Sequence, residues 1–95
     1  MNIVATPQFN AWLSGLKDLT GRARIQARIQ RLAAGNPGQG RRLSANVSEL
    51  KIDVGPGYRV YYAWRGDELV ILLAGGNKST QVRDIALATA LAANL

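Results

Sequence analysis

Cysteine and histidine are both missing from this sequence of 95 residues. Without cysteine there is no disulfide framework and no thiolate metal site. Without histidine the chain lacks the commonest general base and the commonest metal ligand, which excludes cysteine–histidine catalysis and the serine triad. Only six acidic residues are present. Because metal-dependent hydrolysis needs clustered carboxylates, a two-metal nuclease is disfavoured, and we expect neither a metal nor a cofactor.

Long hydrophobic runs are absent as well. The longest, LVILLA at residues 69–74, is far too short to cross a bilayer, and the first residues do not have the pattern of a signal peptide. The length fits one domain over residues 1–95, and a hydrophobic content of 47% is normal for a globular core. We expect a soluble cytoplasmic protein with no membrane partner.

Basic residues outnumber acidic ones, with twelve Lys and Arg against six Asp and Glu and a net charge of +6. Nine of the twelve are arginine, whose planar guanidinium matches phosphate oxygens, whereas lysine acts more as a point charge. This balance favours nucleic acid or an acidic protein as partner, although charge for solubility also accounts for it.

The hydrophobic pattern predicts an α+β fold in the order β-α-α-β-β-β-α, with a small antiparallel sheet packed against an N-terminal helical hairpin. Thr6-Pro7 begins the first helix, and Thr20 is the candidate cap of the second. Residues 35–42 are rich in glycine and proline and are predicted as a loop. The predicted strands are residues 2–6, 47–54, 58–65 and 68–75, and the helices begin near residues 6, 19 and 79.

Pairing of the strands at 47–54 and 58–65 through the Gly-Pro-Gly turn sorts their side chains onto two faces. The core face carries Leu50, Ile52 and Val54 beside Val60, Tyr62 and Trp64. The opposite face carries Glu49, Lys51 and Asp53 beside Arg59, Tyr61 and Arg65. On that face Lys51 and Arg59 can stabilise a phosphate that gains charge, and Tyr61 can stack a base or form a hydrogen bond. Lys78, Gln81 and Arg83 leave the neighbouring strand and are expected at the same rim.

Structural explanations compete with each of these assignments. Arg59 could form an exposed ion pair with Asp53, and Tyr61 could pack across the strands. The stripe of Arg24, Arg28 and Arg31 suits a solvated helix face or an RNA contact. Arg41 and Arg42 suit plain loop cations or phosphate contacts. The residues alone leave these alternatives open.

Two longer segments resemble a known family. ELKIDVGPGYRVYY (49–62) and LLAGGNKSTQVRDI (72–85) are similar to toxins of the RelE/ParE superfamily, and closest to its HigB-like, phage Gp49-like branch of addiction module killer proteins. FNAWLSGLKD and ARIQARIQRLAAGNPG also fit the N-terminal helical hairpin of that branch. The resemblance implies a RelE-like fold and the toxin of a type II toxin–antitoxin module.

The RelE resemblance also implies an activity, namely cleavage of mRNA in the decoding site of the ribosome by attack of the 2′-hydroxyl on the adjacent phosphate. Arg59 then matches the arginine that stabilises the phosphate, Lys51 the base or an electrostatic stabiliser, and Lys78 a catalytic arginine. The catalytic tyrosine of RelE has no counterpart, since this region has the sequence QVRDI, which leaves Lys78, Arg83 or Tyr61 as candidate acids.

Two other functions remain open at this stage. ParE-type members of the superfamily poison DNA gyrase, and the missing tyrosine and histidine give that alternative weight. A non-catalytic basic module that binds nucleic acid is the third possibility. For either kind of toxin the resemblance implies a co-encoded antitoxin, usually a helix-turn-helix DNA-binding protein, and for the ribonuclease it implies the ribosome and mRNA as further partners.

Overall fold

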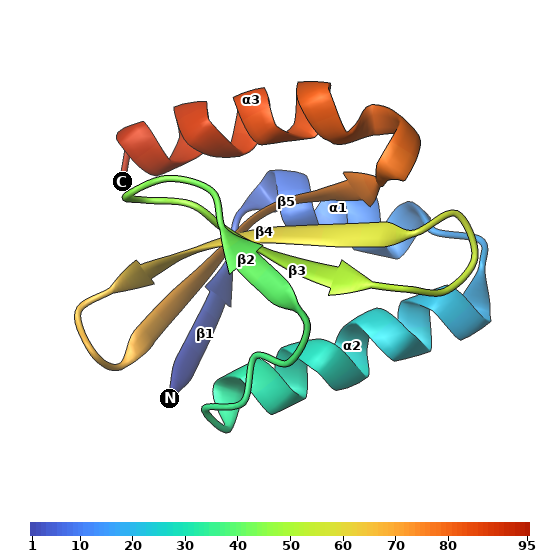
Figure 1. Cartoon of the computed structure of the whole chain (residues 1–95), viewed down its shortest axis with the longest axis horizontal. Coiled ribbons are helices and arrows are strands. Elements are labelled where there is room, and N and C mark those ends of the chain that lie inside the picture. The colour runs from blue at the N-terminus through green and yellow to red at the C-terminus, as the bar shows by residue number, and fades with distance from the viewer.

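A five-stranded sheet with helices on both faces organises the chain, as the computed structural model of residues 1–95 shows (Figure 1). The α+β class predicted from the sequence is confirmed. No helix has the length and hydrophobicity that crossing a membrane would require. The elements in chain order are β1 (Asn2–Ala5), α1 (Pro7–Gly15), α2 (Leu19–Ala33), β2 (Gly40–Arg42), β3 (Ser48–Ile52), β4 (Tyr58–Arg65), β5 (Leu69–Asn77), the 3-10 turn η1 (Lys78–Thr80) and α3 (Gln81–Ala93).

The sheet is mixed, so the prediction of an antiparallel sheet was wrong in one pair. Its strand order is β1-β5-β4-β3-β2, and β1 runs parallel to β5 while the other pairs are antiparallel. No tight turn joins β1 to its partner, so nothing local fixes its direction. The strand β2 also forms inside the segment predicted as a loop, where Gly40 pairs with Leu50.

The helices divide the core into two parts. Phe9 of α1 and Ile25 and Leu32 of α2 pack with Val60 and Leu72 on one face of the sheet. On the other face Ala88 of α3 packs with a second cluster of buried residues, Val47, Tyr61, Ala63, Ile71, Leu73 and Ala74. In Figure 1 α3 lies above the sheet and α2 below it. The strand β5 supplies residues to both clusters, which confirms its prediction as a central strand.

Side-chain caps fix where the first two helices begin. Thr6 caps α1 as predicted, since its hydroxyl accepts from the backbone N–H of Phe9. For α2 the cap is Asp18 and not Thr20, because the Asp18 carboxylate accepts from the backbone N–H of Gly21. The same carboxylate accepts the hydroxyl of Tyr58 at 2.8 Å, which ties the start of α2 to the sheet.

Trp64, which was predicted to face the core, is 44% exposed, because β4 extends beyond Tyr62, the last residue that pairs with β3. The core face of β4 therefore ends at Tyr62, two residues earlier than the hydrophobic pattern suggests.

Two glycines at the end of β5 let helices approach it from both sides. A Cβ on Gly75 would overlap the ring of Trp12 in α1, and a Cβ on Gly76 would overlap the carboxylate of Asp84 in α3. The close approach places the beginning of α3, with Gln81, next to the polar side chains of Glu49 in β3 and Arg59 in β4.

Candidate functional site

The pairing of β3 with β4 builds the candidate site. Lys51 lies opposite Arg59, and Glu49 lies opposite Tyr61. Their side chains project from the face that α3 covers, whereas Leu50, Ile52, Tyr58, Val60 and Tyr62 belong to the core under α1 and α2. The alternation in the sequence thus predicted which of these side chains share a face.

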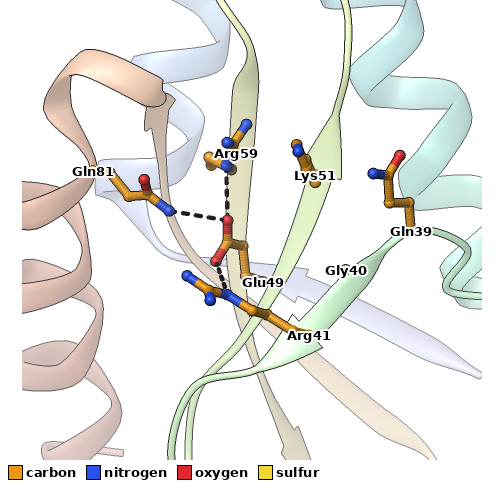
Figure 2. A pocket seen from close by; sticks show the side chains of 7 residues that line it. All are labelled: Gln39, Gly40, Arg41, Glu49, Lys51, Arg59 and Gln81. Carbon is orange, nitrogen blue, oxygen red and sulfur yellow. Dashed lines mark hydrogen bonds and ion pairs between the residues drawn. The ribbon is translucent and has the colours of Figure 1, made fainter.

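A polar cleft of about 340 Å³ opens between β2, β3, β4 and the start of α3 (Figure 2). None of its lining residues is hydrophobic. Gly40 is required on the β2 side, because a Cβ there would overlap the backbone carbonyl of Glu49. The lining residues are Gln39, Gly40, Arg41, Glu49, Lys51, Arg59 and Gln81.

A buried carboxylate, Glu49, organises this cleft. Its side chain is 4% exposed and receives the Nε of Arg41 at 3.3 Å and the Nε2 of Gln81 at 3.3 Å (Figure 2). The Nε of Arg59 lies 2.8 Å from Oε1 of Glu49, but its N–H does not point at the oxygen, so this contact is an ion pair and not a directed hydrogen bond. The sequence-based pairing of Arg59 with Asp53 was therefore wrong.

Arg59 is held rigidly and keeps one edge free. The side chain is 7% exposed, and its Nη1 donates to the backbone carbonyls of Gly57 at 3.1 Å and Tyr58 at 3.4 Å. Its Nη2 makes no hydrogen bond within the chain. A guanidinium that lines a cleft, is fixed in place and has one nitrogen without a partner is well suited to bind an anion.

Lys51 is a second cation of the cleft and, unlike Arg59, it has no carboxylate partner. It is half-buried, it lines the cleft, and it forms no ion pair. Together with Arg41 and Arg59 it outnumbers the single carboxylate of Glu49, so the cleft carries net positive charge. A positive, polar, partly enclosed cleft favours a phosphate or a carboxylate over a neutral ligand.

Tyr61 does not present its ring to this cleft, which contradicts its predicted role in RNA binding. The side chain is fully buried in the core under α3, as the alternative of cross-strand packing proposed. Its hydroxyl is buried without a hydrogen-bond partner. Burial, with smaller contributions from the charges of Glu49 and Asp84, raises the pKa of Tyr61 to about 12. Neither base stacking nor proton donation near neutral pH fits this environment.

The other predicted residues fall into two groups. Arg41 and Gln81 line the cleft. Lys78, which was predicted as a catalytic residue, does not line the cleft and is exposed beside Gly57. Three further predicted residues also lie outside the cleft. Arg42 turns to the carbonyls of Ser44 and Ala45, Arg83 is exposed and pairs with Asp84, and Arg65 lies six residues beyond Arg59, about 20 Å along β4 at ~3.3 Å per residue.

Sequence reasoning missed a residue that holds the cleft together, Arg28 of α2. Its guanidinium donates to the backbone carbonyls of Lys51 at 2.6 Å, Gln39 at 2.7 Å and Pro37 at 2.9 Å. These bonds fix the segment that carries Gln39 and Gly40 against the end of β3. Desolvation, with a smaller contribution from the charge of Arg31, lowers the pKa of Arg28. The helical stripe showed where Arg28 lies, but no pattern in the sequence shows which carbonyls it meets.

Comparisons with known proteins identify a family and a relative of this chain. The family described as "Phage derived protein Gp49-like (DUF891)" matches residues 11–92. An uncharacterized protein of Haemophilus influenzae is 48% identical over 95 residues, which cover all of this chain and 96% of that protein. No solved structure matches the chain significantly.

Proposed function

The chain belongs to the Gp49-like family of phage-derived proteins, and from this membership together with its cleft we propose that it is the toxin of a type II toxin–antitoxin module. We further propose that it is an endoribonuclease that needs no metal and cuts mRNA on the ribosome. The observation that carries the proposal is the pair of cations at the cleft, Lys51 without a partner and Arg59 with a free Nη2, beside one buried carboxylate.

In the proposed reaction the RNA supplies its own nucleophile. Glu49, the only carboxylate of the cleft, accepts the proton of the 2′-hydroxyl as its oxygen attacks the adjacent phosphorus. The bond to the 2′-oxygen forms and the bond to the 5′-oxygen breaks, which leaves a 2′,3′-cyclic phosphate and a 5′-hydroxyl. Arg59 and Lys51 stabilise the charge that develops on the phosphate, and the Lys51 ammonium gives a proton to the departing 5′-oxygen.

The antitoxin is a second element of the proposal. A positive cleft with exposed Arg41 at its rim suits an acidic segment of a partner protein, which would cover the site and neutralise it. The co-encoded protein is expected to supply that segment and to bind DNA through a helix-turn-helix.

Primer extension on cellular mRNA after induction of the chain tests this function. Wild-type protein should produce cuts within translated codons, and Arg59→Ala should slow cleavage by about 10²–10³-fold, the usual effect of removing one electrostatic stabiliser. Arg65→Ala is the matched control, because it removes one arginine from the same strand about 20 Å away. Full toxicity of Arg59→Ala would place the site elsewhere. An SOS response with linearised plasmid and intact mRNA would instead indicate a gyrase poison.

A further inference from the structure

A second basic pocket lies on the other side of the sheet edge. It has a volume of about 300 Å³, at the lower end of the range for small-ligand sites, and it lies between α2 and the end of β3. Its rim carries Arg24, Arg28 and Arg31, and its apolar surface comes from Ile52 and Val54. Nothing in the proposed cleavage reaction uses this pocket.

The three arginines of this pocket are crowded without being neutralised. None of them forms an ion pair within the chain, and Asp53 is the only carboxylate in the pocket lining. Arg28 cannot turn away from the others, because three backbone carbonyls hold its guanidinium. A plain solvated helix face would leave its cations free to separate in water. Here the fixed Arg28 keeps positive charge concentrated between the exposed Arg24 and Arg31.

The second pocket adjoins the cleft. Gln39 lines both, and Lys51 lies at the boundary, with its side chain in the cleft and its backbone carbonyl bound to Arg28. The strand β2 pairs with β3 only from Ser48 to Leu50, and the carbonyl of Gln39 accepts the backbone N–H of Lys51 at 3.0 Å. No strand lies on that side of Ile52, where β3 ends. A flexible strand that is bound in the cleft can therefore pass around this edge and reach α2 without crossing another element.

We propose that this pocket binds a flanking nucleotide of single-stranded RNA, an inference that rests on the proposed ribonuclease function. Arg24 and Arg31 contact the backbone phosphate on either side of the fixed Arg28. The base lies against Val54 and Ile52 or stacks on a guanidinium plane, which accepts any base. The pocket thereby adds affinity and direction to the bound strand without reading its sequence.

Fluorescence anisotropy with uncleavable 2′-O-methyl RNA tests the inference, with a dinucleotide that fills only the cleft and an octanucleotide that reaches the pocket. Each phosphate contact to a single strand contributes about 0.7 to the slope of log affinity against log salt, so the double variant Arg24→Ala/Arg31→Ala should lower the octanucleotide slope by about 1.4. When salt is raised from about 50 to 200 mM, the double variant should therefore lose roughly sevenfold less affinity for the octanucleotide than the wild type loses. Dinucleotide binding should not change.

Arg22→Ala is the matched control, because it removes one arginine from another face of the same helix and lines neither pocket. A double variant with the salt slope of the wild type would overturn the inference. If Arg59→Ala still weakened the binding of both oligonucleotides in that case, the proposed function would stand. If the double variant lost affinity while Arg59→Ala did not, the α2 pocket would be confirmed and the cleavage site overturned. Failure of the wild-type chain to bind either probe would overturn both.

Discussion

Replacing Tyr61 by phenylalanine separates packing from chemistry beneath the cleft. The Tyr61 ring is fully buried and its hydroxyl has no hydrogen-bond partner. An unsatisfied buried polar group costs about 1–3 kcal/mol. Because Tyr61→Phe removes this hydroxyl and keeps the ring, we expect the free energy of unfolding to rise by about 1 kcal/mol at neutral pH. For a domain of this size that corresponds to roughly 4–8 °C in Tm.

Alkaline pH should widen the difference between the two proteins. Burial first, and then the charges of Glu49 and Asp84, raise the pKa of Tyr61 from 10.0 to about 12. Between these pH values the unfolded chain releases the proton of Tyr61 while the folded chain keeps it. The contribution of protonated Tyr61 to the free energy of unfolding is therefore fully present below pH 10 and is lost as pH rises toward 12. At about 1.36 kcal/mol per pH unit, the wild type loses about 2.7 kcal/mol that the phenylalanine variant retains.

Urea denaturation followed by circular dichroism from pH 8 to pH 12 measures both effects. Titration of the other tyrosines changes the stability of both proteins equally, so it cancels in the difference between them. The same preparations should cleave RNA at equal rates, since a fully buried hydroxyl takes no part in the proposed reaction. A variant destabilised by more than about 1 kcal/mol at neutral pH would show that the hydroxyl has a partner. A hundredfold loss of cleavage would show that it acts in catalysis, and either result refutes the reasoning.

Three further perturbations test the supports of the cleft. Glu49→Ala leaves Arg59 buried without a carboxylate and should lower the free energy of unfolding by about 3–5 kcal/mol in thermal denaturation, with a smaller loss in Glu49→Gln. Arg28→Ala removes a donor to three carbonyls, and we expect a loss of about 2–4 kcal/mol with faster amide hydrogen exchange where β2 meets β3. The N–H of Gly21 lowers the pKa of Asp18, so the stability that this carboxylate contributes is present above its usual pKa and is lost as pH falls through the lowered one. The Tm of Asp18→Asn should therefore vary less between pH 5 and pH 2, and equal pH dependence in both proteins would contradict the capping role.

Local pattern was sufficient to predict the hairpin of β3 and β4. Strict alternation sorts the side chains of both strands onto two faces, and it correctly put Lys51 and Arg59 on the same face. The same alternation placed Tyr61 and Glu49 on the polar face, and there it was incomplete. Whether a side chain on that face meets solvent depends on α3, which arrives from a distant part of the sequence and covers Tyr61.

Contacts that are not local account for the other errors. The strand β2 forms in a segment rich in glycine because Gly40 alone can approach the carbonyl of Glu49 so closely. Arg28 reaches carbonyls 9, 11 and 23 residues away, and no periodicity encodes such partners. The direction of β1 is likewise set by β5, which lies at the other end of the chain.

That parallel pairing has a consequence for synthesis of the protein. The strand β1 leaves the ribosome before its partner residues, 69–72, which lie 67 positions further along the chain. The hydroxyl of Thr6 donates to the carbonyl of Leu73, 67 residues away, so even the cap of α1 is incomplete until then. Contacts of such long sequence separation slow folding. The nascent chain therefore holds β1 unpaired until β5 has emerged, and the cleft cannot assemble until the start of α3 has followed, because Gln81 lines it.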